Sequence, residues 1–424
     1  MSILTRIQYS RFVRTALALP LAMLVLLGCG DVTPATDDSV SEQTVPVAVN
    51  ATPFPALTLP PVSLAEGLPG QSDFAVLFVN VGKADAAILR FGDTTVLIDT
   101  GSAASVPQLF AGLNALNVSA IDAVFITHSH SDHLGGLDAL AANYPISVVY
   151  SPLYSEMDKN GAGKIVKRAE KLELAHHELE AGESIAVSSG VSFAVLGPLS
   201  LNEEDDNDNS LVLRFSYGGK TFLFTGDMQF AEEQTLVEAG TDLRSDVLKV
   251  GNHGNPDATG DDFAALVSPS LAVISTNTLE DTDSANERVF AALSTARAYV
   301  TQNFVIGALL TLDDAGEILV SNPARSGVAL DVVIQRIDAA RQSVTLENNG
   351  SGEADLSGCI LFSARSGAAL RFPNDTILSS GQSLVVGSGG TFVFPDEDAP
   401  LSKKKTNTVT LFDSLGTRLS QYEQ

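Results

Sequence analysis

The chain has 424 residues, of which 45% are hydrophobic and 18% are charged, so it can build packed domains and is not a disordered chain. Its formal net charge of −26 argues against non-specific electrostatic binding to nucleic acid. This charge does not exclude an enzyme that acts on a polyanion, because a bound metal supplies its own local positive charge. The two cysteines, Cys29 and Cys359, do not indicate a disulfide framework.

Residues 1–28 are typical of an export signal. Three arginines are the only charged residues there, and an apolar run over residues 16–27 follows them. This run is too short to cross a bilayer comfortably. It ends in LLGC at Cys29, which resembles the lipobox of bacterial lipoproteins, whose cysteine is lipidated and becomes the first residue. We therefore expect a lipid anchor on Cys29; the alternative is an ordinary signal peptide with a coincidental cysteine.

Residues 29–72 are rich in Thr, Pro and Ser, which predicts an extended linker. Beyond it, helices are expected at residues 106–116, from residue 132 onward, at 165–174 and at 287–296. Short apolar runs predict strands at residues 74–80, 86–91, 95–99, 123–127, 147–150, 191–196, 211–217, 221–225, 247–250 and 271–275. Gly218 and Gly219 separate two of these runs and indicate a hairpin. Because strands alternate with helices but include a hairpin, we predict an α/β domain with mixed sheets over residues 73–326.

The pattern changes in the C-terminal part of the chain. Short β-like runs, separated by Gly, Asn and Ser clusters, occur at residues 332–337, 343–347, 359–362, 383–386, 391–394 and 408–412. No convincing helical pattern lies between them. This composition predicts a separate all-β sandwich over residues 327–424.

The strongest candidate site is the sequence THSHSDHLGG at residues 127–136. Three of the chain's six histidines, His128, His130 and His133, lie in it. His128 and His130 are two residues apart on an extended segment, so their side chains point the same way. Neutral imidazoles and the carboxylate of Asp132 are good ligands for a borderline divalent ion such as zinc. The two glycines that follow let the backbone pass close beneath such a site.

Two further residues follow predicted strands where a second set of ligands is expected. Asp227 follows the strand at 221–225 in the sequence TGD, and His253 follows the strand at 247–250 in GNHG. Each lies beside a glycine at a strand end, where loops carry function on a rigid sheet. Either residue alone is weak support, since an Asp after a strand is more often a helix N-cap.

Taken in order, the motifs HxHxDH, GD and HG resemble the metallo-β-lactamase superfamily. The finer resemblance is to the extracellular hydrolase domain of the ComEC competence family, and it covers residues 74–322. It rests on residues 78–85 (FVNVGKAD), 96–101 (VLIDTG), 207–213 (NDNSLVL) and 248–254 (LKVGNHG). The resemblance implies an αββα sandwich and a metal-dependent hydrolase that acts through a metal-activated water.

The resemblance also implies a role for each motif residue around two divalent ions, with zinc expected and manganese as the alternative. The carboxylates of Asp132 and Asp227 are the expected catalytic groups, and Asp132 could also orient the attacking water. The expected ligands are His128 and His130 for the first metal, Asp132, His133 and His253 for the second, and Asp227 as the bridge between them.

The sequence departs from the superfamily pattern in three places. The histidine of a Gly-His-Thr segment is missing, and we expect residues 205–209 to border the first metal instead. A His-His-Gly motif is replaced by GNHG at residues 251–254, and a Gly-His-Pro near residues 283–286 is absent. Among other residues with reactive side chains, His176 and His177 are expected at the surface. Lys249 could approach a phosphate but is expected to be an ordinary strand lysine.

The C-terminal block resembles the lamin-tail family, which implies an immunoglobulin-like sandwich. The matching stretches are residues 332–337, 344–348, 355–359 and 409–416. Cys359 stands where that family usually has Trp, which suggests a small buried residue rather than a reactive thiol. The basic run at residues 403–405 is expected to be a solvated loop rather than a nucleic-acid contact.

These features predict a lipid-anchored or secreted enzyme of the bacterial cell envelope. We expect a metal-dependent phosphodiesterase or nuclease whose substrate is extracellular nucleic acid, with the membrane contacted through the lipid anchor. The substrate rests on family analogy. One alternative is another hydrolase on the same fold, of lactonase or β-lactamase type. The other is a non-enzymatic surface binding module.

Overall fold

The computed structural model of this protein describes residues 73–155, 163–323, 329–395 and 399–424. The predicted export signal, Cys29 and the linker therefore lie outside the described residues. Within the described ranges, no helix has both the length and the apolar character needed to cross a membrane.

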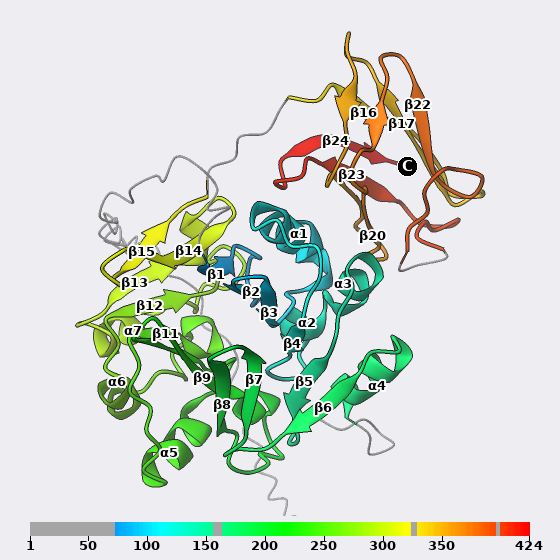
Figure 1. Cartoon of the computed structure of the whole chain (residues 1–424). Coiled ribbons are helices and arrows are strands. Elements are labelled where there is room, and N and C mark those ends of the chain that lie inside the picture. The colour runs from blue at the N-terminus through cyan, green and yellow to red at the C-terminus, as the bar shows by residue number, and fades with distance from the viewer. Residues whose placement is uncertain (1–72, 156–162, 324–328, 396–398) are drawn as a thin grey trace, which may run out of the picture. The chain divides into compact units, whose positions relative to one another are not determined.

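Two large sheets form the first part of the structure (Figure 1). The first has eight strands, in the order β15 (Ile318–Ser321), β14 (Gly307–Leu312), β1 (Phe74–Val79), β2 (Ala87–Phe91), β3 (Thr94–Ile98), β4 (Ala123–Phe125), β5 (Val149–Pro152) and β6 (His176–Leu179). The second has seven, in the order β13 (Arg297–Val300), β12 (Leu271–Ile274), β11 (Val247–Lys249), β10 (Lys220–Phe224), β9 (Val212–Tyr217), β8 (Val191–Gly197) and β7 (Ser184–Ser188). Both sheets contain parallel and antiparallel pairs, as expected.

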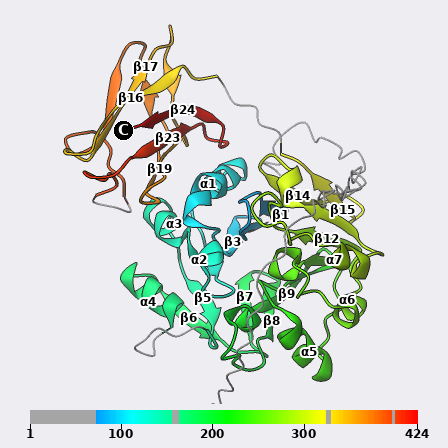
Figure 2. The same cartoon turned by 180° about the vertical axis from the view of Figure 1, so that it is seen from behind.

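Helices cover the outer face of each sheet, and Figures 1 and 2 show α1 to α4 beside the first sheet and α5 to α7 beside the second. Their bounds are α1 (Val106–Ala115), α2 (Ser131–Leu134), α3 (Leu137–Asn143), α4 (Lys164–Lys171), α5 (Phe230–Glu238), α6 (Asp261–Val267) and α7 (Glu287–Ala292). Short 3₁₀ turns lie at η1 (Ala103–Ser105), η2 (Asp206–Asn209), η3 (Gly251–Gly254) and η4 (Thr301–Asn303).

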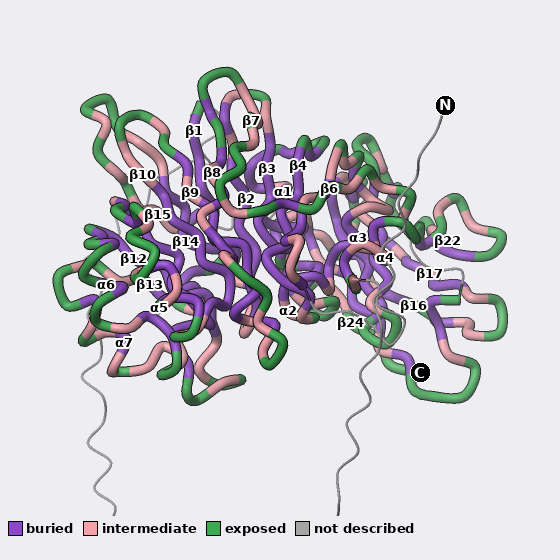
Figure 3. Tube along the Cα trace, turned by 90° about the horizontal axis from the view of Figure 1, so that it is seen from below, coloured by how far each residue is buried: buried purple, intermediate pink, exposed green. Residues whose placement is uncertain are grey.

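The packing of β1 explains its unbroken apolar sequence, FAVLFV. Ala75, Leu77 and Val79 belong to the core beneath α1 and α3, whereas Phe74 and Phe78 belong to the core between the two sheets. A strand that is buried on both faces has no polar positions to alternate with. A third core lies between the second sheet and α5 to α7. These layers are an αββα sandwich, which confirms the predicted fold class, and the strands appear as a buried centre in Figure 3.

The C-terminal part is built of small β-sheets around its own apolar core. Its strands are β16 (Val332–Asp338), β17 (Ser343–Asn348), β18 (Ala354–Asp355), β19 (Ile360–Ser363), β20 (Ala369–Arg371), β21 (Ile377–Leu378), β22 (Ser383–Gly387), β23 (Thr408–Phe412) and β24 (Arg418–Glu423). The strand predicted at residues 391–394 was wrong, because this segment forms only one isolated bridge, between Phe392 and Val386. Cys359 is buried, and burial raises the pKa of its thiol to about 12, so it is not a reactive thiolate.

Asn114 of α1 connects the helical layer to the C-terminal strands. Its side-chain Nδ2 donates to the backbone oxygens of Gly358, at 3.0 Å, and Ser414, at 2.8 Å. Its Oδ1 accepts a hydrogen bond from Arg371 Nε at 2.7 Å. Both donors of this amide and its carbonyl oxygen are therefore bonded to residues far away in the sequence.

Candidate metal centre

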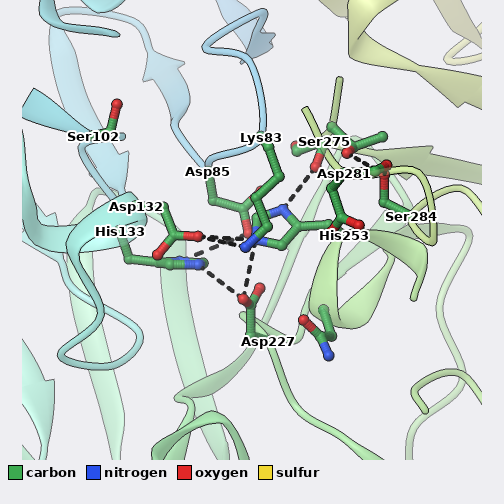
Figure 4. A network of polar contacts seen from close by, with 12 residues as sticks. Lys83, Asp85, Ser102, Asp132, His133, Asp227, His253, Ser275, Asp281 and Ser284 are labelled. Atoms are coloured by element: carbon green, nitrogen blue, oxygen red, sulfur yellow. Dashed lines mark hydrogen bonds and ion pairs between the residues drawn. The ribbon is translucent and has the colours of Figure 1, made fainter. Parts of the chain in front are cut away.

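The candidate site lies where parallel strands of both sheets end. β3 and β4 run parallel in the first sheet, and β10, β11 and β12 run parallel in the second. Their carboxyl ends therefore share one edge of each sheet, which is the usual place for a binding site in α/β folds. The segments that follow these strands carry Asp99, His128, Asp227 and His253. Figure 4 shows how side chains from both sheets approach one another.

His128 lies in the loop between β4 and α2 and is completely buried. Its Nδ1 is 3.2 Å from Thr127 Oγ1, and that hydroxyl gives its own proton to Asp99 Oδ2 at 2.8 Å. The hydroxyl is then an acceptor for Nδ1–H, which leaves the lone pair on His128 Nε2 free to bind a metal. The ring of His130 lies 4.6 Å from that of His128 between centroids, so the two imidazoles gather as the motif predicted.

His133, on the single turn of α2, is also completely buried. Its Nδ1 donates to Asp99 Oδ2 at 2.8 Å, which fixes the ring and leaves Nε2 to face Asp227 Oδ2 at 3.1 Å. A carboxylate behind a histidine in this way is the usual support for a metal-binding imidazole. Gly136, which comes shortly after α2, packs against the backbone oxygen of Thr100. A Cβ on Gly136 would collide with that oxygen. The predicted close passage of the backbone is therefore present.

Asp227 and His253 come from the second sheet. The backbone of His253 has φ +54°, and its Nδ1 donates to the backbone oxygen of Ser275 at 2.8 Å. Its Nε2 lies 3.1 Å from Asp227 Oδ2 and 3.5 Å from Asp132 Oδ2. The structure thus brings Asp132, Asp227 and His253 together, although they are distant in sequence.

Two residues of this centre were not predicted as site residues. The Nζ of Lys249 forms an ion pair with Asp85 Oδ2, donates to the backbone oxygen of Gly226 at 2.8 Å and lies 3.7 Å from Asp227 Oδ1. Lys249 and Asp85 are both buried. The expectation of an ordinary strand lysine was therefore wrong, because this lysine neutralises carboxylates inside the centre. The available signal was position, since Asp85 ends the motif at residues 78–85 and Lys249 lies just before the GNHG motif.

Lys83 makes a second charged contact, at the edge of the centre. Its Nζ lies 2.8 Å from Asp132 Oδ2, and both side chains are partly exposed, by 30% and 20%. The Asp132 carboxylate therefore reaches from the buried histidines to the surface. The sequence motif contains Lys83, but its role was not predicted.

Residues 205–209 border the histidine loop through hydrogen bonds. Asp206 Oδ2 accepts from the backbone nitrogen of Ser129 at 3.0 Å and from Ser129 Oγ at 2.6 Å. Ser129 lies between His128 and His130, so Asp206 holds the loop that presents both rings. The contacts that the structure shows are with the backbone nitrogen and the hydroxyl of Ser129, and a place beside the first metal stays a prediction.

Histidines 176 and 177 lie away from this cluster, on β6. His176 is half-buried, with its Nε2 2.9 Å from Ser151 Oγ, and His177 is exposed. His177 is therefore at the surface as expected, whereas His176 is half-buried.

The donor atoms fit a metal ion. One ligand atom each from Asp85, His133, Asp227 and His253 lie within 4.8 Å of one another, and all four residues are buried. Within the described part of the chain, His128 Nε2 is a buried side-chain atom that makes no hydrogen bond. The Nε2 atoms of His133 and His253 make none either, and their contact is the ion pair with Asp227 Oδ2 at 3.1 Å. Unsatisfied buried polar atoms are costly, and bound ions would satisfy these. Imidazole nitrogens and carboxylate oxygens suit zinc or manganese.

The charges of the centre depend strongly on one another. Burial alone would raise the pKa of Asp227, but His133 and His253 outweigh it and hold that pKa well below its usual range. Burial opposes the charged form of His253 as well, yet Asp227 and Asp132 raise its pKa to about 9. Burial and the nearby His133 lower the pKa of His128. Asp227 and Asp99 also raise the pKa of His133 well above its usual range, against burial. The protein alone therefore holds charged His133 and His253 beside a neutral His128, and a metal ligated by those two rings must displace a proton from each.

Comparison with known proteins agrees with this geometry. Residues 79–278 match the family model of the metallo-beta-lactamase superfamily. ComE operon protein 3 of Bacillus subtilis (strain 168) is 26% identical over 223 residues, which cover 48% of this chain and 28% of that protein. Competence protein ComA of Neisseria gonorrhoeae is 32% identical over 207 residues, covering 48% and 27%. The crystal structure of the metallo-beta-lactamase fold protein YhfI from Bacillus subtilis aligns with a TM-score of 0.38 at 14% identity, covering 54% of this chain and 95% of that one.

The chain therefore carries a metallo-beta-lactamase domain, which has a hydrolase fold and a group of residues that could hold metal ions. The two curated relatives named above confirm the finer resemblance to the ComEC family. The chain spans just over a quarter of the length of these two relatives, 28% and 27%.

Proposed function

We propose that this protein is a metal-dependent phosphodiesterase that cleaves nucleic acid outside the cytoplasm. The observation that carries the proposal is the set of buried histidine and aspartate ligand atoms that converge at the strand ends of both sheets. Hydrolysis follows from the site, and nucleic acid as the substrate follows from the likeness to competence proteins.

The proposed ligand sets follow the sequence motifs. The side chain of Asp227 supports its role as the bridge, because Oδ2 is shared by two histidine nitrogens while Oδ1 points elsewhere in the centre. His128 and His130 would hold the first ion, and Asp132, His133 and His253 the second. Two bound ions, zinc or manganese, would supply a hydroxide from water and neutralise charge on the phosphodiester.

The chain's own residues would keep this centre ordered. Asp99 holds the ring of His133, and the carbonyl of Ser275 holds the ring of His253, so each presents Nε2. Asp132 is partly exposed, so its carboxylate can contact both the buried centre and an incoming water or substrate. The Lys249 ammonium pairs with Asp85 and lies near Asp227, so it offsets negative charge on two buried carboxylates.

The test uses the purified full chain with zinc or manganese and labelled single- and double-stranded DNA and RNA. We expect slow cleavage without strong sequence preference, abolished by a chelator. Asp227→Ala should reduce the rate of cleavage by more than about 100-fold. Removing a group that only orients a metal ligand already lowers metal affinity or activity by about 10- to 100-fold, and Asp227 is itself a proposed ligand. Asp93→Ala, which changes an exposed turn residue, is the matched control.

Other outcomes would replace the proposal. A chain that leaves nucleic acid intact but opens a lactone or a β-lactam would be a different hydrolase on this fold. A chain that binds no metal and hydrolyses none of these substrates would be a non-enzymatic binding module.

We further propose that Cys29 is lipidated and anchors the protein in the cell envelope, with residues 29–72 as the linker. The support is the LLGC sequence after an apolar run. Cys29→Ser should move the protein from the membrane fraction to the soluble fraction. Unchanged membrane association would exclude this anchor.

We also propose that residues 327–424 are a lamin-tail-like domain, supported by their small sheets and their own core.

A further inference from the structure

Lys83 places a positive charge at the edge of the candidate metal centre. Its Nζ lies 2.8 Å from Asp132 Oδ2, and the same carboxylate oxygen lies 3.5 Å from His253 Nε2. One carboxylate oxygen therefore lies between the ammonium and a buried imidazole of the centre, and Figure 4 shows these three side chains near one another. The Lys83 side chain is 30% exposed, whereas His253 is completely buried. A ligand that reaches the centre from solvent at this edge therefore meets Lys83.

The loop between β1 and β2 holds Lys83 in this place. Val81 and Ala84, on either side of it in the sequence, are buried in the core beneath α1 and α3. The backbone nitrogen of Asp85 donates to the backbone oxygen of Asp132 at 3.1 Å, which fastens the loop to α2. The loop therefore meets Asp132 through its backbone and through the Lys83 side chain. Such a side chain is already in position and loses little conformational freedom when it contacts a ligand.

The groups around Lys83 are acidic. Its backbone nitrogen donates to Glu280 Oε2 at 3.2 Å, and the carboxylates of Asp227 and Asp281 act on its ammonium electrostatically. Within the described part of the chain, the ammonium makes one hydrogen bond, to Asp132 Oδ2. An ammonium has three N–H donors, so two remain for a ligand.

The proposed ligand roles of the aspartates leave this ammonium with charge to share. Once Asp132 and Asp227 ligate ions, the ions offset the negative charge of these two carboxylates. The Lys83 ammonium is then a positive charge at the entrance to the centre that its neighbours no longer balance in full. The other acidic groups at this edge, Glu280 and Asp281, repel an anion, so the attraction for an anion comes from Lys83 on the protein side.

We propose that Lys83 binds an anionic oxygen of the substrate at the metal centre and so selects a phosphodiester over an uncharged ester. The inference rests on the proposed function, since it assigns the substrate class of the same site. The N–H groups that are not bonded to Asp132 donate to a non-bridging phosphate oxygen. A hydrogen bond between two charged groups is about twice as strong as one between neutral groups. A charge that is fixed in place favours an anionic transition state without reorganisation, and it gives less to the carbonyl of a lactone.

The experiment compares Lys83→Gln and Lys83→Arg in the purified full chain loaded with zinc. Glutamine can still donate a hydrogen bond to Asp132 but has no charge, whereas arginine keeps the charge. The matched control is Lys220→Gln. It removes one charge from a partly exposed lysine that pairs with Glu317, at the opposite end of β10 from the centre.

Two measurements do not depend on turnover. Competition with a coloured chelator gives the Kd of zinc, and titration calorimetry gives the Kd of inorganic phosphate for the zinc-loaded protein. We expect Lys83→Gln to raise the phosphate Kd about tenfold, which is typical for the loss of one hydrogen bond to a charged group. It should not weaken zinc binding, because the lost charge repels the ion. Lys83→Arg should restore most of the phosphate affinity, and Lys220→Gln should match the wild type.

The kinetic measurement compares bis(p-nitrophenyl) phosphate, which is an anion, with bis(p-nitrophenyl) methylphosphonate, which has the same leaving group and no charge. We expect Lys83→Gln to lower kcat/KM for the anionic substrate about tenfold relative to the uncharged one. Lys83→Arg and Lys220→Gln should keep the wild-type ratio.

An unchanged phosphate Kd in Lys83→Gln would overturn the inference, and so would a zinc-loaded wild type that binds no phosphate. Weaker zinc binding with an equal loss for both substrates would also overturn it, because Lys83 would then only position Asp132. The failure of the proposed function is a separate result: the wild type would bind phosphate through Lys83 but cleave no phosphodiester.

Discussion

His133 Nδ1 lies 2.8 Å from Asp99 Oδ2, and both residues are completely or almost completely buried. Asp99 ends one strand of the first sheet and also accepts hydrogen bonds from the backbone and the hydroxyl of Thr127. One carboxylate therefore orders both the histidine of α2 and the start of the histidine loop. The backbone of Asp99 has φ +60°, which is uncommon for a residue other than glycine. Uncommon backbone conformations of this kind cluster at functional sites.

The first prediction concerns this support. Asp99→Asn keeps the shape of the side chain but removes the charge that orients His133 Nδ1–H. The metal dissociation constant should rise about 10- to 100-fold, as is usual when the partner behind a ligating histidine is lost. Competition with a coloured chelator measures it. Asp93→Asn is the matched control in an exposed turn, and equal affinities in the two variants would contradict the assigned role of Asp99.

The second prediction is that metal binding releases protons. Asp227 and Asp132 raise the pKa of His253 to about 9 against the opposing effect of burial, so its Nε2 is protonated at pH 7 in the metal-free protein. Asp227 and Asp99 likewise raise the pKa of His133, the other histidine assigned to this ion, well above its usual range. A metal ligated by both rings must displace two protons, so the apparent Kd should fall on the order of 100-fold per pH unit from pH 6 to pH 8. Calorimetry in buffers of different ionisation enthalpy counts the protons released. His177→Gln, at an exposed histidine, should leave the count unchanged, and a pH-independent Kd would refute the prediction.

The third prediction concerns the buried ion pair of Lys249 and Asp85. Lys249→Met leaves the Asp85 carboxylate buried without the lysine that pairs with it, which should destabilise the metal-free protein by about 3–5 kcal/mol. Adding Asp85→Leu should restore part of this loss, because the unpaired charge is then removed.

Urea unfolding in the presence of a chelator measures both variants. The control is Lys220→Met, which breaks the more exposed pair with Glu317 and should cost at most about 1 kcal/mol. A Lys249→Met variant as stable as this control would show that the buried pair contributes little.

The fourth prediction concerns pH and a carboxylate remote from the metal centre. Burial, opposed by the hydrogen bond from the backbone of Leu199, raises the pKa of Glu232 to about 7. The folded protein thus binds a proton more tightly than the unfolded chain does. The stabilisation from this group is complete below its unfolded pKa, near 4.5, and is lost as pH rises through 7.

The free energy of unfolding of the wild type should fall between pH 5 and pH 8 as Glu232 loses its proton. In Glu232→Gln this fall should be about 2 kcal/mol smaller, because the residue no longer titrates. Denaturant midpoints across this range measure the change. Glu238→Gln, on the exposed side of the same helix, should retain the wild-type pH dependence. A wild-type slope in the Glu232 variant would mean that this carboxylate is ionised throughout.

The sequence alone determined the features that depend on residues close to one another in the chain. The motif at residues 127–136 predicted that His128, His130 and His133 gather, because side-chain direction follows from an extended segment and one helical turn. Gly218 and Gly219 predicted the hairpin of β9 and β10, and both have the positive φ that such a turn requires. The resemblance to the superfamily predicted the αββα fold and the strand-end positions of Asp227 and His253.

Only the tertiary structure decided which distant residues meet. Asp85 and Lys249 are 164 residues apart, and neither is recognisable as half of a buried pair, because a lone charge in an apolar run gives no information about its partner. The strand predicted at residues 391–394 failed for a related reason, since an apolar run becomes a strand only where a neighbour offers a matching edge. Such contacts depend on long-range packing, which local sequence patterns do not specify.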